Sequence, residues 1–305
     1  MQLRRRETYW DTLKGLLIFL VVLGHTGSCL GEKLTSVIYI FHMPLFILVS
    51  GYFSNPKALE KYMKGIKQLL GFYLLFHIIY IVYDVKCGTI LTLSRILIPS
   101  FGLWYLLSLC YWRTLIQFFH APIKRFPLLF IGGSILLSIG VGFIPLDSQM
   151  SFQRTFTFFP FFILGYYAKQ FNWLDGLRHF NRVNATIILL VLMVVVYVYV
   201  FPFYANAHFD KISDCFIRCL QLGIALLVCI CMLRIVPQKL SIMTTLGTYT
   251  LIVYLFHPPL ILIGKRILDY LHLPHNPLSG IIIAVIAILI ISLIKDLKFI
   301  RIFNR

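Results

Sequence analysis

The sequence predicts an all-α membrane protein, a bundle of about ten transmembrane helices. Hydrophobic residues make up 59% of the 305 residues and charged residues only 13%, and the mean hydropathy is +0.86. Apolar runs recur about every 25–30 residues from end to end, which is the length of one membrane span and its loop. Lys and Arg residues gather in alternate loops between these runs, as they do in polytopic membrane proteins.

The high positive charge of the chain does not indicate a nucleic-acid partner. The net charge is +17, but the basic residues lie between apolar runs and do not form one face. They suit loops that face anionic lipids. Because apolar runs fill the whole length, we expect one integral membrane domain over residues 1–305. No spacing of Cys and His is typical of a metal site, so no metal is predicted.

The expected spans are separated by brief loops that carry turn signals such as Pro122, Pro145 and Pro237. The fifth is the weakest, because it is short and contains four glycines. In chain order the ten predicted spans cover residues 12–30, 36–54, 66–84, 95–118, 127–144, 152–170, 184–202, 214–234, 241–264 and 278–296.

The orientation follows from the distribution of basic residues. The N-terminus, the even-numbered loops and the C-terminus together carry more than twice as many Lys and Arg residues as the other side. Cytoplasmic segments carry this excess. We therefore expect both termini in the cytoplasm, which requires an even number of spans.

The first span contains ionisable residues, and such residues inside a membrane are costly unless they have a function. Asp11 and Lys14 are three residues apart, and His25 follows Lys14 by eleven. Both separations return to one helix face. At 1.5 Å per residue, His25 is expected about 20 Å above the cytoplasmic start of the span.

Two further histidines are expected at a similar depth. By the same rise per residue, His42 lies about 21 Å and His257 about 24 Å above the cytoplasmic side. Each histidine alone fits separate packing against a carbonyl or a serine. Their shared depth favours one polar cavity, in which His257 contacts the substrate. His77 lies nearer the middle of its span and is interpreted as structural.

Aromatic and basic residues near the expected outer surface have two interpretations. Trp104 and Tyr105 suit an interfacial aromatic belt as well as a platform for a sugar. Arg154 suits a snorkelling interfacial arginine as well as a clamp for a polar acceptor. On the functional interpretation all three bind the substrate at the mouth of the cavity.

The second loop, residues 55–68, carries Lys57, Lys61, Lys64 and Lys67 at spacings of three and four. We expect them on one basic helical face. This pattern is typical of positive-inside charge, and it also suits docking of a phosphorylated cytosolic donor, because ammonium groups bind phosphate.

Several motifs resemble those of the acyltransferase 3 family of multi-pass bacterial membrane proteins. The similarity runs from residue 9 to about residue 261, and the second-span motif is the most specific. The matching segments are residues 9–15 (YWDTLKG), 21–25 (VVLGH), 39–46 (YIFHMPLF), 50–53 (SGYF), 102–107 (GLWYLL), 159–167 (FPFFILGYY) and 246–258 (LGTYTLIVYLFHP).

The resemblance implies transfer of an acetyl group from cytosolic acetyl-CoA to a hydroxyl of a lipid-linked or exported saccharide, in a bacterial plasma membrane. Stand-alone sugar acetyltransferases of the fucose O-acetylase type look most similar. Where the family often has arginines, this chain has Lys14, Lys64 and Lys67. These lysines are the predicted donor-binding residues, and they keep the charge but lose the bidentate guanidinium geometry.

Acyl transfer from a thioester needs a base for the hydroxyl and a group that stabilises the oxyanion. His25 is the predicted base, because the unperturbed pKa of histidine, about 6.5, suits proton transfer near neutral pH. It could instead carry the acetyl group as acetyl-imidazole. His42 would orient His25 or the acceptor, and Asp11 would help to position the donor.

Two other functions remain open at this point. A proton-coupled transporter would also place histidines in the membrane, but it is expected to show internal repeats, and none is seen. The other open function is that of a sensor or structural subunit without catalysis. The sequence does not indicate the sugar, the hydroxyl position or the oligomeric state.

Overall fold

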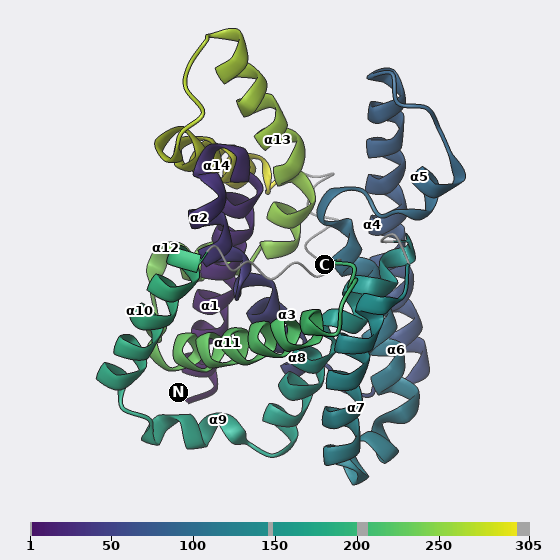
Figure 1. Cartoon of the computed structure of the whole chain (residues 1–305), viewed down its shortest axis with the longest axis vertical. Coiled ribbons are helices and arrows are strands. Elements are labelled where there is room, and N and C mark those ends of the chain that lie inside the picture. Colours follow the sequence, from purple (N-terminus) through teal and green to yellow (C-terminus); the bar gives the residue numbers. More distant parts are fainter. Residues whose placement is uncertain (1, 146–148, 200–206, 298–305) are drawn as a thin grey trace. The chain divides into compact units, whose positions relative to one another are not determined.

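The computed structural model describes residues 2–145, 149–199 and 207–297, and the regular structure in these residues is helical (Figure 1). Four short 3₁₀ segments accompany the α-helices. The α-helices are α1 (Gln2–His25), α2 (Gly27–Tyr39), α3 (His42–Tyr52), α4 (Leu59–Lys86), α5 (Leu93–Leu97), α6 (Trp104–Arg125), α7 (Pro127–Gly140), α8 (Phe152–Gln170), α9 (Trp173–Gly176), α10 (Arg182–Tyr199), α11 (Ser213–Ile235), α12 (Ser241–Gly247), α13 (Thr250–Tyr270) and α14 (Pro277–Ile294).

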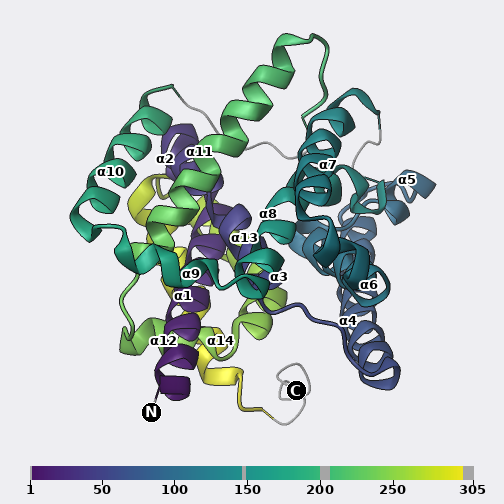
Figure 2. The ribbon, with the colours of Figure 1, turned by 90° about the horizontal axis from the view of Figure 1, so that it is seen from below.

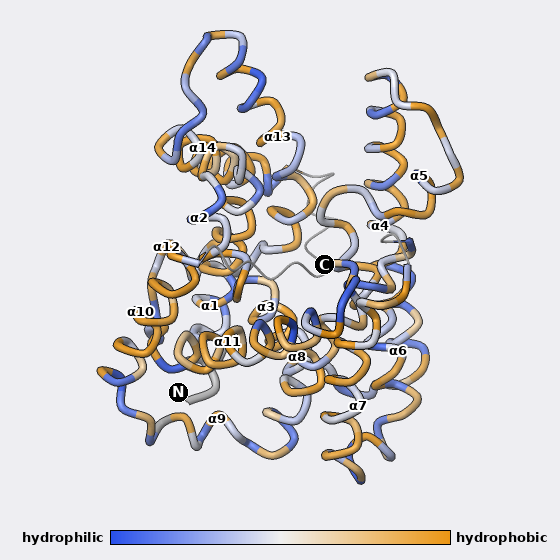
Figure 3. The backbone as a smooth tube through the Cα atoms, viewed as in Figure 1, coloured by the Kyte–Doolittle hydropathy of each residue, from blue (hydrophilic) through white to orange (hydrophobic). Residues whose placement is uncertain are grey.

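The helices make this a polytopic membrane protein, although fewer of them than ten have the length and composition of a complete span. Among the described residues, α4, α10, α11, α13 and α14 are long and apolar enough, and α2 with α3 forms a sixth candidate that bends by 40°. Apolar residues dominate these helices, and hydrophilic residues gather mostly near their ends (Figure 3). The prediction of ten spans is therefore met only in part by this criterion.

The remaining predicted spans also form helices, but of a different character. Helix α1 has 24 residues, α6 has 22 and α8 has 19, so each is long enough to cross a bilayer. They contain more polar and aromatic residues than the five apolar helices. Helix α7 is apolar but shorter. Residues 200–202 of the seventh predicted span lie outside the described residues.

The first two predicted spans differ from the structure in their continuity. Helix α1 ends at His25, α2 begins at Gly27, and a turn at residues 40–41 separates α2 from α3. Pro44 has no N–H to donate to the carbonyl of Ile40, four residues earlier, so a continuous helix would leave that carbonyl unpaired. Gly31 inside α2 has a φ of 76°, which favours glycine.

The chain folds as two compact units, which are described separately below. The first comprises residues 1–46, 177–203 and 221–305, and the second comprises residues 47–176 and 204–220. Each unit combines segments that are distant in sequence. The single domain expected over residues 1–305 stays a prediction.

In the first unit, α1 packs closely along α12 and also contacts α13. Two glycines allow the close approach. A Cβ on Gly15 would lie 1.8 Å from the carbonyl oxygen of Met243, and one on Gly247 would lie 1.8 Å from that of Asp11. The hydroxyl groups of Thr12 and Thr244 form a hydrogen bond of 2.8 Å across the same contact. This packing holds the polar face of α1 in a defined position.

In the second unit, α8 packs against α6 and α7, and the three helices lie side by side (Figure 2). The second half of α3 contacts α8 through another glycine pair. A Cβ on Gly165 would lie 1.9 Å from the carbonyl oxygen of Leu48, and one on Gly51 would lie 2.0 Å from that of Phe162. The sequence motifs that contain these glycines therefore serve helix packing, because any larger residue would separate the backbones.

Candidate active site

The predicted polar face of α1 begins with an ion pair. Lys14 Nζ lies 2.7 Å from Asp11 Oδ1, and both side chains are partly exposed. This contact follows from their three-residue spacing on one helix. The pair therefore presents a neutralised charge, not a free cation, along the helix that ends at His25.

His25 is the last residue of α1, and several contacts fix the helix end there. Thr26 donates a hydrogen bond from its hydroxyl to the carbonyl of Leu23 at 2.7 Å. Lys265 of α13 donates from Nζ to the carbonyl of His25 at 3.1 Å. A cation at a helix C-terminus interacts favourably with the helix dipole. The His25 ring is half-buried.

His257 of α13 lies beside His25. The two ring centroids are 5.0 Å apart and the rings are nearly perpendicular, at 74°. His257 is fully buried, and its Nδ1 lies 2.9 Å from the carbonyl oxygen of Val253. Because a carbonyl only accepts hydrogen bonds, Nδ1 carries the proton and Nε2 presents a lone pair. Among the described residues this buried Nε2 has no hydrogen-bond partner.

His42, the first residue of α3, has the same tautomer. Its Nδ1 lies 2.8 Å from the carbonyl oxygen of Ile38, so its Nε2 is also unprotonated in the neutral ring. His42 is 5% exposed and lies within electrostatic range of His25. Tyr39 packs on the His42 ring at 5.1 Å between centroids and donates its hydroxyl to the carbonyl of Gly24 at 3.2 Å.

The structure thus groups three histidines from α1, α3 and α13 in the first unit, and we call His25, His42 and His257 the histidine centre. Backbone carbonyls fix the tautomer of two of its rings, with the proton on Nδ1. The third, His25, is the more accessible to solvent. Such a group can accept a proton from a hydroxyl without burying a charge at rest. Their catalytic roles, and the cavity that they were expected to line, stay predictions.

The predicted substrate residues of the second unit also lie together. The guanidinium carbon of Arg154 is 5.5 Å from the centre of the Trp104 ring. Trp104 stacks on Phe158 with centroids 5.4 Å apart. The Tyr105 hydroxyl forms a hydrogen bond of 2.5 Å with Ser50. Both Trp104 and Tyr105 are buried, which differs from the lipid-facing rings of an interfacial belt.

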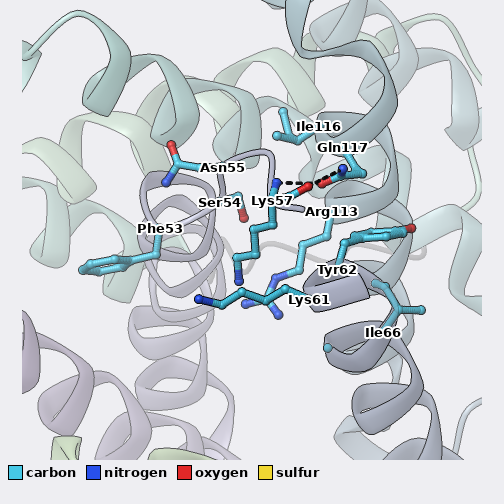
Figure 4. A pocket seen from close by; sticks show the side chains of 11 residues that line it. Phe53, Ser54, Asn55, Lys57, Lys61, Tyr62, Ile66, Arg113, Ile116 and Gln117 are labelled. Carbon is cyan, nitrogen blue, oxygen red and sulfur yellow. Dashed lines mark hydrogen bonds between the residues drawn. The ribbon is translucent and has the colours of Figure 1, made fainter. Parts of the chain in front are cut away.

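The four lysines of the predicted second loop lie on both sides of the start of α4. The helix begins at Leu59, so Lys57 lies before it and cannot share its face. Lys64 and Lys67 are exposed on the helix. Lys57 and Lys61 line a pocket together with Arg113 of α6 (Figure 4). The expectation that all four lysines form one helical face is therefore wrong.

Some positioning residues were not predicted from the sequence. One of them is Lys265, which donates to the carbonyl of His25. Gly24 admits Tyr39, because a Cβ there would lie 2.9 Å from its ring. The small residue Gly24 directly before His25 in the motif VVLGH could have indicated a tight contact beside the histidine. No sequence signal indicated Ser151. This residue directly precedes α8 and has a φ of 64°. Its hydroxyl donates to the Trp104 carbonyl at 3.2 Å.

No group of three or more His, Cys, Asp or Glu residues within the described ranges has a geometry that could hold a metal ion. No disulfide links the cysteines in this part of the chain. Cys29 instead contacts His275, with Sγ 3.7 Å from Nδ1, and His275 Nε2 lies 2.7 Å from Asp269 Oδ1. This contact ties the connection between α13 and α14 to α2.

The fold and the motifs identify a membrane-bound acyltransferase. A family model described as an acyltransferase domain matches residues 7–296, and the chain belongs to this family, the acyltransferase 3 family. Family membership implies an acyl donor and an acyl acceptor. It confirms the family assignment that the motifs predicted.

Two curated relatives are both described as nodulation protein NolL. The protein of Mesorhizobium japonicum is 28% identical over 199 residues, which is 56% of this chain and 50% of that protein. The protein of Sinorhizobium fredii is 39% identical over 64 residues, 18% of each chain. At most, the chain spans about half the length of these curated relatives. No solved structure matches.

Proposed function

We propose that this protein transfers an acetyl group from cytosolic acetyl-CoA to a hydroxyl of a saccharide that is lipid-linked or exported. The observation that carries the proposal is the histidine centre, in which three imidazoles from separate helices meet within a family of acyltransferases. Transfer from a thioester needs no further activation of the donor. The protein has to supply a base, orientation and stabilisation of the oxyanion.

In the proposed reaction His25 takes the proton of the acceptor hydroxyl while its oxygen attacks the thioester carbonyl. A C–O bond forms, the tetrahedral intermediate collapses, the C–S bond breaks, and the CoA thiolate receives the proton from His25. In the alternative route the His25 ring attacks the thioester, a C–N bond forms, the C–S bond breaks and CoA leaves as the thiol. The acceptor hydroxyl then attacks the acetyl-imidazole, which forms the ester and returns the neutral ring. Both routes use the same residue, because it is the accessible member of the centre.

The other residues have positioning roles in this proposal. The lone pairs on Nε2 of His42 and His257 would accept hydrogen bonds from the His25 ring or from the acceptor. Asp11 and Lys14 would direct the donor along α1 towards His25, and Lys64 and Lys67 would attract the anionic donor to the basic loop.

The paired Trp104 and Arg154 suit a sugar acceptor. Phe158 already stacks on the buried Trp104 ring. The sugar would therefore be bound by the Arg154 guanidinium, which donates to hydroxyl oxygens and which Trp104 holds in place. Tyr105 would fix the neighbouring backbone through Ser50. These residues would bind the acceptor, whereas the histidine centre would carry out the transfer.

We also propose ten membrane crossings with both chain ends in the cytoplasm of a bacterial cell. The distribution of basic residues supports this topology. Helices α1, α6 and α8 would then cross the membrane in contact with other helices, which satisfies their polar residues. The basic start of α4 would face the cytosolic donor.

The test is acetyl transfer by the purified protein in neutral-lipid nanodiscs. Acetyl-CoA with an isotopic label in the acetyl group is incubated with surface saccharides from a strain that lacks the gene. We expect label in an ester that mild alkali releases, together with free CoA thiol. Label that stays on CoA with every saccharide fraction, while the protein remains folded, would contradict the proposal.

A proton-coupled transporter is the second candidate, because buried histidines are typical of proton relays. It predicts a pH gradient-driven flux in proteoliposomes that does not require an acyl donor. Covalent transfer of the label in detergent, where no gradient exists, would be incompatible with that function as the sole activity.

A further inference from the structure

An open pocket lies in the second unit, between the start of α4 and the middle of α6 (Figure 4). Its empty space is about 400 Å³, including the part open to solvent. Three cationic side chains line it: Lys57 before α4, Lys61 in the first turns of α4, and Arg113 of α6. We call this the basic pocket. The predicted donor-binding pair, Lys64 and Lys67, does not line it.

The charges of the basic pocket are not balanced by its own residues. None of the described residues that line it is Asp or Glu. Figure 4 shows the nitrogen ends of Lys57, Lys61 and Arg113 gathered on one side of the pocket. Burial lowers the pKa of Lys57, and Arg113 and Lys61 lower it further through their charges. Three like charges held this close repel one another, so an anion in the pocket would relieve the repulsion.

The backbone of the pocket is fixed, although its lysine side chains reach solvent. Gln117 of α6 binds Lys57 twice: the Lys57 N–H donates to Oε1 at 3.0 Å, and Nε2 donates to the Lys57 carbonyl at 2.9 Å. The Tyr62 hydroxyl bonds that of Thr114 at 2.8 Å and so joins α4 to α6. The backbone that carries these cations is therefore in place before any ligand arrives, which lowers the entropy cost of binding.

We propose that the basic pocket binds a phosphate group of the acyl donor, held by Lys57, Lys61 and Arg113. Arg113 offers a planar guanidinium that bonds two phosphate oxygens, and the lysines add compact charges. This rests on the proposed function, because that function supplies a donor with phosphate groups on its nucleotide portion. It moves the donor site from the exposed pair Lys64 and Lys67 to a formed pocket.

A phosphate on this face has a second source, the headgroups of anionic lipids. In the donor the phosphate belongs to a soluble nucleotide, whereas in a lipid it belongs to a membrane headgroup. Binding assays with soluble and membrane-bound probes distinguish the two. Calorimetry in nanodiscs of zwitterionic lipid uses CoA, adenosine 3′,5′-bisphosphate and inorganic phosphate as probes. A parallel series replaces part of the lipid with phosphatidylglycerol.

The variants are Lys57→Gln/Lys61→Gln and Arg113→Gln, with Lys124→Gln/Arg125→Gln as the matched control. The control removes two exposed cations at the end of α6, outside the pocket. We expect each pocket variant to weaken CoA and bisphosphate binding by about 10-fold or more, because charge-assisted hydrogen bonds are lost. The control should change affinity less than about 2-fold. If the double variant does not fold, Lys61→Gln alone serves the same comparison.

The proposal is overturned if pocket and control variants weaken nucleotide binding equally, or if neither does. It is also overturned if the pocket variants weaken the interaction with phosphatidylglycerol and leave bisphosphate affinity unchanged. Failure of the proposed function looks different: nucleotide binding would still depend on the pocket, but no saccharide would receive label from acetyl-CoA. If acetyl transfer occurs but CoA binding does not depend on the pocket residues, the pocket proposal is wrong and the proposed function still stands.

Discussion

The histidine centre and the basic pocket show opposite ways to handle ionisable groups. In the first unit, His42 and His257 are buried, and carbonyls within their own helices or next to them fix the proton on Nδ1. In the second unit, Lys57, Lys61 and Arg113 keep charges near solvent, and no acidic residue in the described part of the chain lines the same pocket. A buried neutral imidazole is suited to proton transfer, and a cluster of partly exposed cations is suited to anion binding.

The contrast separates two kinds of kinetic effect. Substitutions in the histidine centre should lower turnover, because they remove groups that act in the transition state. Substitutions in the basic pocket should raise the KM for the donor and should depend on salt, because exposed charges are screened. Four substitutions, with matched controls, test this division between turnover and donor binding.

The largest effect is expected for His25→Ala. Removal of a general base lowers turnover by about 10²–10⁴-fold. Turnover is measured as acetyl transfer to saccharide, and thermal melting checks the fold. The control is His120→Ala, which removes an exposed histidine near the end of α6. Turnover within about 3-fold of the original protein, with an unchanged melting temperature, would remove His25 from the reaction.

The next effect concerns the helix contact that positions the histidine centre. Gly15→Ala should destabilise the protein by about 1–3 kcal/mol, because the added Cβ forces α1 and α12 apart. Gly132→Ala in α7 is the matched control, since its Cβ would meet no atom within 4 Å. Thermal melting in one detergent compares the two. Equal melting temperatures would show that the α1–α12 contact is looser than described.

A smaller effect is expected for His257→Phe, which keeps an aromatic ring beside His25 but loses the Nε2 lone pair. Loss of one hydrogen bond of about 1.4 kcal/mol corresponds to a 10-fold fall in turnover. The comparison is His77→Phe. Both nitrogens of His77 are bonded, to Ser100 and to the carbonyl of Ile96. That variant should lower the melting temperature and leave the turnover of folded protein unchanged. If His77→Phe lowers turnover and His257→Phe lowers only the melting temperature, His77 acts in the reaction and His257 is structural.

The smallest effect is expected for Arg154→Lys, which keeps the charge and loses the planar group above Trp104. We expect the KM for the saccharide to rise about 3-fold and the KM for the donor to stay constant. Lys33→Gln removes another cation from above an aromatic ring, that of Tyr197, and serves as the control. If the KM for the donor changes and the KM for the saccharide does not, Arg154 binds the donor and not the acceptor.

Much of the architecture was predictable from the sequence, because long apolar runs leave few alternatives to helices in a membrane. The predicted span 152–170 coincides with α8. The breaks at Thr26 and at residues 40–41 were not predicted, although Pro44 could have indicated the second. Hydropathy averages over such breaks, since the residues on both sides are apolar.

The candidate site was predictable in part. Helical rise placed His25, His42 and His257 at similar depth, and the structure brings these three together. The sequence could not indicate which nitrogen of each ring carries the proton, because that depends on carbonyls such as those of Ile38 and Val253. It also could not separate Lys61 from Lys64, because spacing alone does not show which lysine faces Arg113.

The separate roles of the histidine centre and the basic pocket are tested by measuring donor affinity and turnover in two variants, His25→Ala and Lys57→Gln/Lys61→Gln. We predict that His25→Ala binds CoA with the original affinity and loses at least about 100-fold in turnover. The lysine variant should bind CoA about 10-fold more weakly and keep its turnover at saturating donor. If His25→Ala loses CoA binding while it remains folded, or if the lysine variant loses turnover at saturation, the division between a chemical centre and a binding pocket is wrong.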